Sequence, residues 1–223
     1  MKRLLFTREI TPLQISNFNL PDLKIDPKAF IRVEFVDFNY SKETKYALFT
    51  SKNAVKALVD NSYIKLLTNT ICIAVGDKTA KELHKYGLKT ITPKNSCAEG
   101  LVELFKEHPH INGISYFCGE KRRSLIEDFF DSFKYDYHSI VVYKTVEVEV
   151  LLDPYNYDGI AFASPSAVSA FFRQYPGVKL PCFAIGDTTA DALKYYTDSI
   201  MVAQKPSIKH LALCAYDFFE NKH

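Results

Sequence analysis

The chain contains the same stretch twice. ICIAVGDKTAKEL, from Ile71 to Leu83, returns with few changes as PCFAIGDTTADAL, from Pro181 to Leu193. A second pair lies upstream of these copies: ALFTSKNAVKAL from Ala47 to Leu58, and IAFASPSAVSAF from Ile160 to Phe171. Two copies of one unit, each with its segments in the same order, predict two similar lobes rather than a single continuous core.

Short apolar runs alternate with amphipathic segments of about ten residues, a pattern that is typical of parallel βαβ units with helices on both faces of the sheet. Residues 10–30 show no clean helical period, so we expect an irregular segment with room for one short helix. The expected strands are 2–6, 31–38, 46–50, 70–75, 88–92, 114–118, 137–150, 159–163, 182–185 and 199–203. The expected helices begin after Ser51 and after Gly76 and otherwise cover 97–106, 121–133, 166–174, 188–196 and 208–220.

The second copy stops one strand and one helix short of the first. The N-terminal KRLLFTRE resembles GISYFCGEKR of the first copy, so we expect the N-terminus to supply the missing strand. The predicted fold is therefore α/β, with two similar lobes, each a parallel sheet flanked by helices, joined by a two-stranded linker. The boundaries are residues 1–33 and 149–223 for a discontinuous lobe 1, residues 37–143 for lobe 2, and about 31–38 and 137–150 for the linker strands.

Composition excludes several classes of protein. Twenty-eight basic and 26 acidic residues leave a net charge of +2, too near balance to indicate a nucleic-acid surface from bulk charge alone, so any anion site must be local. The five cysteines form no CxxC pair and indicate reduced thiols. The apolar start MKRLLF is interrupted by Arg8 and Glu9, which argues against a signal peptide, and no segment is long enough to span a membrane. The six histidines show no metal spacing. We expect a cytoplasmic monomer with no metal, no nucleic-acid partner and no membrane partner.

Taken in order, the motifs resemble those of the uroporphyrinogen-III synthase family, and the resemblance covers nearly the whole chain. The matching motifs are FTR, FTSKNAV, AVGDKTA, FCGEKR, VYKT, SPSAV and AIGDTTA. The chain departs from the family after FTR, where the usual helix is not recognisable. The resemblance implies a lyase of heme biosynthesis without a cofactor. It would expel the terminal hydroxyl of linear hydroxymethylbilane as water and close the ring with inversion of the last pyrrole, in a cleft between the lobes.

The resemblance also implies site residues. VYKT supplies Tyr143, which we expect to be catalytic, because a phenol is protonated at neutral pH and can donate to the departing hydroxyl. Without the resemblance, a packing aromatic on a half-exposed strand would be the better interpretation, since the chain has 14 tyrosines. FCGEKR adds Gly119 and Arg122 to the predicted substrate contacts, within the basic run Lys121 to Arg123. Arg8, at the end of the first strand, is a further candidate for a substrate carboxylate.

The repeated motifs place hydroxyl side chains at or near helix N-termini, where free backbone N–H groups and the helix dipole favour anions. These residues are Ser51, Thr79, Ser164 and Thr189, and we predict that they bind substrate carboxylates. The alternative is that each one caps its own helix.

A second function remains open at this point, a bilobed tetrapyrrole-binding or anion-binding protein without catalysis, because the same donors would serve it equally well. Nucleotide binding is disfavoured, since AVGDKTA and AIGDTTA each contain one glycine and neither resembles a GxGxxG or Walker A loop.

Overall fold

The computed structural model describes residues 1–41, 44–95, 98–122 and 124–221. Two predicted features fall outside these ranges, the start of a helix at Cys97 and the basic side chain of Arg123. The chain divides into two compact units, of which unit 1 comprises Met1–Arg32 and Val146–His223 and unit 2 comprises Val33–Thr145.

Unit 2 is built on a sheet in which five neighbouring strands are parallel. The central strands of the sheet are fully buried, and their sequences are mostly apolar, because helices cover both faces of the sheet. In order across the sheet the strands are β3 (Ile31–Phe35), β8 (Tyr137–Glu147), β7 (Ile114–Gly119), β4 (Tyr46–Phe49), β5 (Ile71–Ala74) and β6 (Thr90–Ile91).

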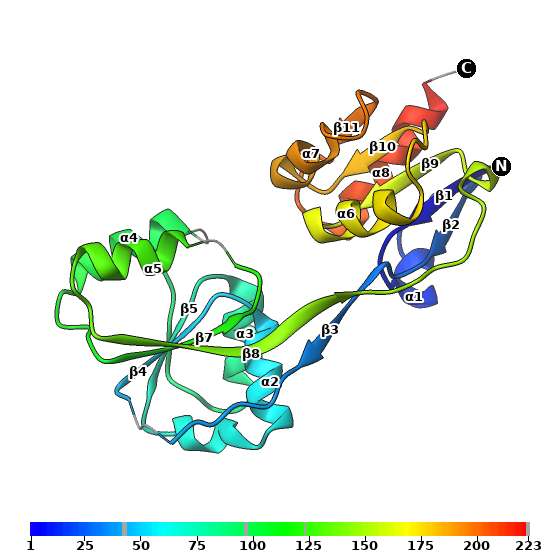
Figure 1. The fold of residues 1–223 in the computed structure, drawn as a ribbon. Coiled ribbons are helices and arrows are strands. Elements are labelled where there is room, and N and C mark those ends of the chain that lie inside the picture. The colour runs from blue at the N-terminus through cyan, green and yellow to red at the C-terminus, as the bar shows by residue number, and fades with distance from the viewer. Residues whose placement is uncertain (42–43, 96–97, 123, 222–223) are drawn as a thin grey trace. The chain divides into compact units, whose positions relative to one another are not determined.

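Two pairs of helices flank this sheet (Figure 1). Helices α2 (Lys52–Asp60) and α3 (Asp77–His84) bury their apolar sides in one core, against alternate residues of the central strands. Helices α4 (Ala98–Glu107) and α5 (Leu125–Ser132) cover the opposite face with a second core. A short 3₁₀ turn, η1 (Tyr63–Leu67), follows α2.

Unit 1 repeats this arrangement with a break in the chain. Its strands, all parallel to their neighbours, are β11 (Ile200–Val202), β10 (Cys182–Ala184), β9 (Gly159–Phe162), β1 (Lys2–Phe6) and β2 (Leu23–Pro27). Strand β1 lies beside β9 as β7 lies beside β4, which confirms that the N-terminus supplies the missing strand of the second copy.

The helices of unit 1 follow the same order. Helices α6 (Pro165–Gln174) and α7 (Asp187–Leu193) share one core, and α8 (Ile208–Glu220) packs with residues of the N-terminal segment on the other face. A 3₁₀ turn, η2 (Pro154–Asn156), precedes β9. The two units thus contain equivalent strands and helices, and their parallel strands lie in the same order across the sheet.

Strands β3 and β8 join the units, since both boundaries of the chain division fall within them. They are hydrogen-bonded neighbours. Val36 N donates to Val142 O over 3.1 Å, and Val148 N donates to Phe30 O over 2.9 Å, so the two segments run in opposite directions. The predicted two-stranded linker is confirmed.

Two predictions are corrected. The segment 10–30 contains one short helix, α1 (Pro12–Ser16), with a capping box at Thr11, as the sequence allowed, but it also contains the edge strand β2, which was not expected. A short helix therefore does follow FTR. The helix predicted to start at residue 121 begins at Leu125 instead, and the side chain of Arg122 bonds to the carbonyl groups of Gly119 and Glu120.

Candidate functional site

Each sheet has one position, between two neighbouring strands, from which the chain connections lead toward opposite edges of the sheet. In unit 2 the chain runs from β4 to β5 and β6 on one side, then returns to β7 and β8 on the other. The equivalent point in unit 1 lies between β9 and β1. Open α/β sheets bind ligands beyond the carboxyl ends of their strands at such a switch point. We call the side of each sheet where the parallel strands end its carboxyl edge.

Ser51 and Gly119 flank the switch point of unit 2. Phe49 of β4 is paired with Phe117 of β7, and Ser51 and Gly119 each lie two residues beyond this pair along the two neighbouring strands. Ser51 is the N-cap of α2, and its hydroxyl oxygen accepts from Asn53 N over 3.2 Å. Ser51 therefore caps its own helix, which is the alternative that the sequence left open, and its binding of a substrate carboxylate remains a prediction. The hydroxyl hydrogen of the cap remains able to donate to a ligand.

A β-bulge in β8 decides where Tyr143 points. Strand β8 pairs with β7 as Cys118 to Val141 and then as Gly119 to Tyr143, which leaves Val142 as an extra residue. A bulge shifts the alternation of side chains by one residue. Val142 and Tyr143 therefore both pack against the core under α2 and α3, although neighbouring strand residues normally face opposite sides. Without the extra residue, Tyr143 would lie on the face of α4 and α5.

The ring of Tyr143 lies directly over Gly119. A β-carbon built on Gly119 would be 2.7 Å from Cζ, 2.8 Å from Cε2 and 2.9 Å from the hydroxyl oxygen of Tyr143, closer than real contacts of this kind. The backbone of Tyr143 is held too, because Glu120 N donates to its carbonyl over 2.9 Å. The structure thus joins two predicted site residues: Gly119 makes room for the catalytic candidate.

The guanidinium of Arg122 is already engaged in hydrogen bonds to nearby residues of the protein. Its Nε and Nη2 donate to the two carboxylate oxygens of Glu127 over 3.1 and 2.6 Å, and Nη1 donates to Gly119 O over 3.2 Å. Hydrogen bonding to Glu127 raises the pKa of Arg122 from its usual value. Each nitrogen of the guanidinium therefore has an acceptor, either in the turn after β7 or in the first turn of α5, and binding of a substrate carboxylate by Arg122 remains a prediction.

Two other titratable groups lie beneath this edge and stay neutral. Tyr116 is 2% exposed, and its hydroxyl lies 3.5 Å from the hydroxyl of Thr50. Burial raises the pKa of Tyr116 to about 12 and the pKa of the Cys118 thiol to about 11. Neither side chain is suited to exchange protons at neutral pH.

The carboxyl edge of unit 1 brings Arg8 and Ser164 to its switch point. Thr7 N, just after β1, donates to Ala161 O over 3.0 Å, which holds the end of β1 beside the end of β9. Ser164 caps α6, and its oxygen accepts from Ala167 N over 3.2 Å. The side chain of Arg8 is exposed, and within the described ranges no ion pair of Arg8 occurs. It is available to an anion.

Thr79 and Thr189 occupy equivalent positions but are buried, with 4% and 3% of their surface exposed. Each lies in the first turn of its helix, and its backbone N–H donates to the N-cap glycine carbonyl, over 2.9 Å to Gly76 and over 3.0 Å to Gly186. Their side chains pack rather than project. Helix α3 has no side-chain cap, so the N–H groups ahead of Thr79 are the more exposed donors at this position.

The prediction from the sequence missed two residues. Ser207 follows β11 and caps α8, with its oxygen accepting from His210 N over 3.2 Å, so it continues the series of Ser51 and Ser164. A serine directly after a proline and before an amphipathic helix could have indicated it. The sequence around Glu127, the partner of Arg122, contains no comparable pattern.

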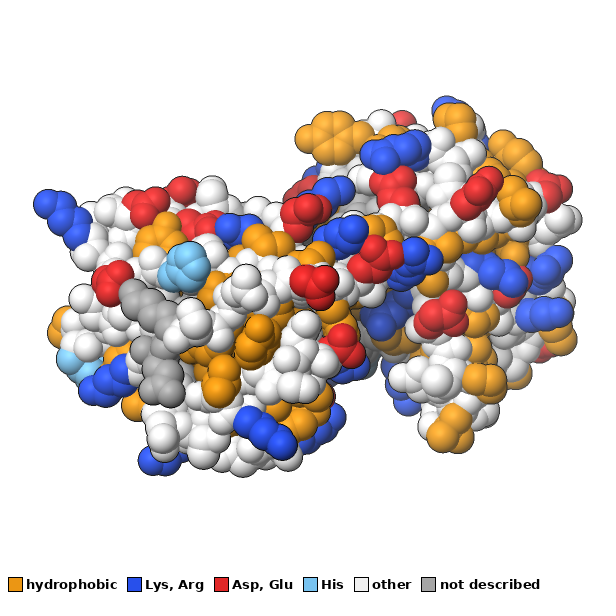
Figure 2. Space-filling model, turned by 60° about the horizontal axis from the view of Figure 1, so that its bottom comes forward, with side chains coloured by type: hydrophobic (Ala, Val, Ile, Leu, Met, Phe, Trp, Pro, Cys, Tyr) orange, Lys and Arg blue, Asp and Glu red, His pale blue; other side chains and the backbone are white. Residues whose placement is uncertain are grey.

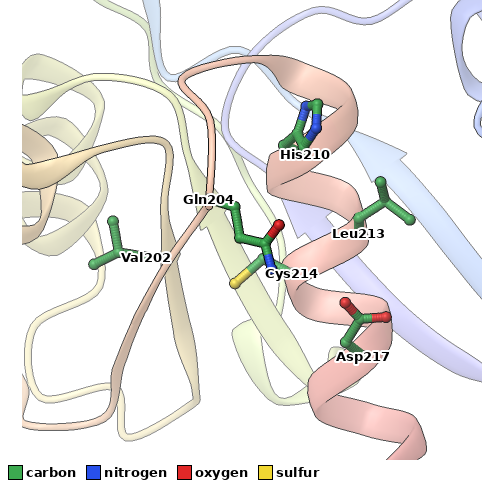
Figure 3. Close-up of a pocket in the computed structure, with 6 residues that line it drawn as sticks. All are labelled: Val202, Gln204, His210, Leu213, Cys214 and Asp217. Atoms are coloured by element: carbon green, nitrogen blue, oxygen red, sulfur yellow. The ribbon is translucent and has the colours of Figure 1, made fainter.

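The mixed charges on the surface agree with a substrate that is bound by a few local donors rather than by a large basic surface. Figure 2 shows basic and acidic side chains interspersed over the face in view, in keeping with the net charge of +2. A separate pocket of about 220 Å³ lies between the end of β11 and one side of α8, lined by Val202, Gln204, His210, Leu213, Cys214 and Asp217 (Figure 3). Ligand pockets typically enclose about 300 to 1,000 Å³, so this pocket is too small for a tetrapyrrole.

The comparisons with known proteins identify the family. Residues 8–212 match a family model described as uroporphyrinogen-III synthase HemD. The chain belongs to the uroporphyrinogen-III synthase family. It is a lyase of porphyrin and heme biosynthesis that cyclises hydroxymethylbilane to uroporphyrinogen III, as the motifs predicted. None of the helices in the described part of the chain has the length and apolar run that a membrane span requires.

Solved uroporphyrinogen-III synthases share the fold. A uroporphyrinogen-III synthetase from Helicobacter pylori matches with a TM-score of 0.75 and 20% identity, covering 98% of this chain and 100% of that chain. A mutant uroporphyrinogen III synthase from Thermus thermophilus matches with a TM-score of 0.62 and 14% identity, with both chains covered in full. A search of curated protein sequences gave no match.

Proposed function

We propose that the carboxyl edge of each sheet binds acetate and propionate groups of hydroxymethylbilane and that Tyr143 is the general acid of the reaction. The observation that carries this proposal is the placement of Tyr143: a bulge turns its ring onto Gly119, beside the switch point and the cap of α2. Switch points are where ligands bind in such sheets. A phenol at that position can meet the reacting end of the substrate.

In the proposed step, the bond between the terminal methylene carbon and its hydroxyl oxygen breaks. The electron pair leaves with oxygen, and the phenol proton completes a water molecule. The adjacent pyrrole nitrogen stabilises the positive charge on the methylene carbon. The α-carbon of the last pyrrole that carries the bridge to the third ring then attacks this methylene carbon. The bond from that α-carbon to the bridge breaks, the bridge carbon bonds to the free α-carbon of the same ring, and the proton that the free α-carbon releases restores the phenol, directly or through water. General acid catalysis of this kind contributes about 100-fold to 10,000-fold.

The carboxylate contacts are proposed for the exposed donors. Ser51 and Ser164 can each donate a hydroxyl hydrogen while their oxygens cap a helix, and Arg8 carries a positive charge without an internal ion pair among the described residues. Hydrogen bonds to charged groups contribute about 1.5 to 3 kcal/mol each, so several of them can hold a flexible tetrapyrrole in one geometry. For Thr79 and Thr189 we propose that the helix turn, rather than the buried side chain, contributes the donor.

We further propose that the enzyme works as a cytoplasmic monomer without a nucleic-acid partner. The near-neutral net charge and the free thiols of Cys72, Cys118, Cys182 and Cys214 support this part of the proposal.

The test is the Tyr143→Phe variant, assayed with freshly prepared hydroxymethylbilane and with separation of the type I and type III isomers after oxidation. We expect kcat for the type III product to fall about 100-fold while KM changes less than about twofold, because the ring stays in place and only the acidic hydrogen is lost. Unchanged kcat would exclude Tyr143 as the acid. Formation of the type I isomer alone by the unmodified enzyme would instead indicate a binding protein.

A further inference from the structure

Arg122, in the turn that follows β7, and Glu127, in the first turn of α5, form a shielded ion pair. The pair is bidentate, and its side chains are only 25% and 19% exposed, compared with 78% and 51% for Lys94 and Glu107. A bidentate pair that is partly withdrawn from water is stronger and more specific in geometry than an exposed one. The guanidinium of Arg122 therefore has a defined orientation.

Glu127 connects this pair to the neighbouring strand. Ser139 of β8 donates its hydroxyl hydrogen to Oε1 of Glu127 over 2.7 Å. Burial raises the pKa of Glu127, but the hydrogen bonds from Arg122 and Ser139 outweigh it and hold the pKa below the usual 4.5. The carboxylate is thus charged at neutral pH and ties α5, the turn and β8 together.

The remaining guanidinium nitrogen, Nη1, bonds to the turn at Gly119 and Glu120, against which Tyr143 packs. Nη1 of Arg122 donates to Gly119 O over 3.2 Å and lies 3.5 Å from Glu120 O. Glu120 N in turn donates to Tyr143 O, and the Tyr143 ring covers Gly119. An unbroken series of contacts therefore runs from the carboxylate of Glu127 to the backbone and ring of Tyr143.

We infer that Glu127 is a positioning residue for Tyr143, acting through Arg122 and the Gly119 turn. The inference rests on the catalytic role proposed for Tyr143. Glu127 fixes the guanidinium, the guanidinium fixes the two carbonyl groups, and the turn fixes the distance of the phenol from the bound substrate. Because a displacement of about 1 Å can cost a catalysed reaction about 100-fold, a loosened turn should slow the reaction without weakening the carboxylate contacts.

The experiment compares Glu127→Gln with a matched variant, Glu107→Gln. Both changes remove one carboxylate charge from an ion pair of 2.6 Å in unit 2, but Glu107 ends α4, which leads into the amino end of β7. We expect Glu127→Gln to lower kcat about 10-fold with KM changed less than about twofold, and Glu107→Gln to keep normal kcat. Rates are referred to the folded fraction, measured by circular dichroism at the assay temperature.

A second comparison separates positioning from general loss of structure. In the Tyr143→Phe background the Glu127→Gln change should cost no further rate, because the phenol that it positions is already absent. If Glu127→Gln folds poorly, Ser139→Ala removes only one hydrogen bond to the carboxylate, and we expect it to lower kcat about threefold with the same dependence on Tyr143.

The outcomes distinguish this inference from the proposed function. Normal kcat in Glu127→Gln together with a slow Tyr143→Phe enzyme would overturn the positioning role alone. An equal loss from Glu127→Gln in both backgrounds would also overturn it, since the effect would not pass through the phenol. A Tyr143→Phe enzyme with normal kcat would overturn the role of Tyr143 itself, and the positioning role with it.

Discussion

Replacing Gly119 with alanine tests the contact that places the proposed acid. The new β-carbon would lie 2.7 to 2.9 Å from three atoms of the Tyr143 side chain. Carbon atoms in ordinary contact are about 3.5 to 4.0 Å apart, so the tyrosine ring has to move by about 1 Å. The turn cannot absorb the displacement easily, because Arg122 and the β7 to β8 pairing hold Gly119 in place.

The size of the effect follows from this displacement. Inserting one carbon into a packed contact costs about 1 to 3 kcal/mol, which in a chain of this length lowers Tm by roughly 2 to 12 °C. Moving a reacting group by about 1 Å costs about 100-fold in rate. We therefore expect the Gly119→Ala enzyme to remain folded at 25 °C, to bind substrate, and to lose about 100-fold in kcat for the type III isomer.

The assay is the isomer-resolved cyclisation of hydroxymethylbilane, with Tm measured on the same preparations. The double variant Gly119→Ala, Tyr143→Phe should be no slower than Tyr143→Phe alone, because both changes act on the same phenol. A Gly119→Ala enzyme with normal kcat and Tm would refute the reasoning. So would a double variant in which the two losses multiply.

Two further predictions concern stability and thiol reactivity. Ser164→Ala should lower the free energy of unfolding by about 1 kcal/mol, because it removes the cap of α6, whereas Ser166→Ala in the first turn of the same helix should change it by less than about 0.5 kcal/mol. Urea denaturation measures both, and equal midpoints would contradict the assigned cap. At pH 8, iodoacetamide should modify Cys214 before Cys72, because burial raises the pKa of the Cys72 thiol to about 12 while Cys214 is only partly buried. Peptide mass spectrometry measures the two rates, and faster modification of Cys72 in the native enzyme would be inconsistent with the packing.

The internal repeat made most of the topology predictable. Two copies of a strand, glycine and helix unit have the same burial pattern in the structure: Thr79 and Thr189 are both buried, and the residues before them are both exposed. Because one hydrophobic pattern buries one face only, the copies had to form equivalent elements. The same reasoning placed the N-terminal strand β1 in the second sheet, since its character matches β7.

Strand β2 was missed for a physical reason. Its sequence, LKIDP, is short and ends in proline, and proline disfavours a strand at the centre of a sheet. The structure places it at an edge, beside β1, where the missing N–H of Pro27 does no harm. Leu23 and Ile25 supply the alternation of buried residues, but two such residues are too few to distinguish a strand from a loop.

The details of the site depend on geometry that no local pattern encodes. The bulge at Val142 turns Tyr143 to the other face, yet VVYKT contains no glycine or other local sign of an extra residue. The pairing of Arg122 with Glu127 spans a turn rather than a helix, so helical spacing does not predict it. Motif order placed the candidate residues at strand ends and helix N-termini, whereas the direction of each side chain required the structure.

The discontinuity of unit 1 sets the order in which the chain can fold during synthesis. Strands β1 and β2 are made first, but β1 needs β9, and Thr7 bonds to Ala161 across 154 residues. A pair of strands with one short helix has too little apolar surface to be stable alone. At about 5 to 20 residues per second, the ribosome delivers β9 on the order of ten seconds later. Unit 2 is continuous and can close in the interval, so strands β1 and β2, although synthesised before unit 2, are buried after it.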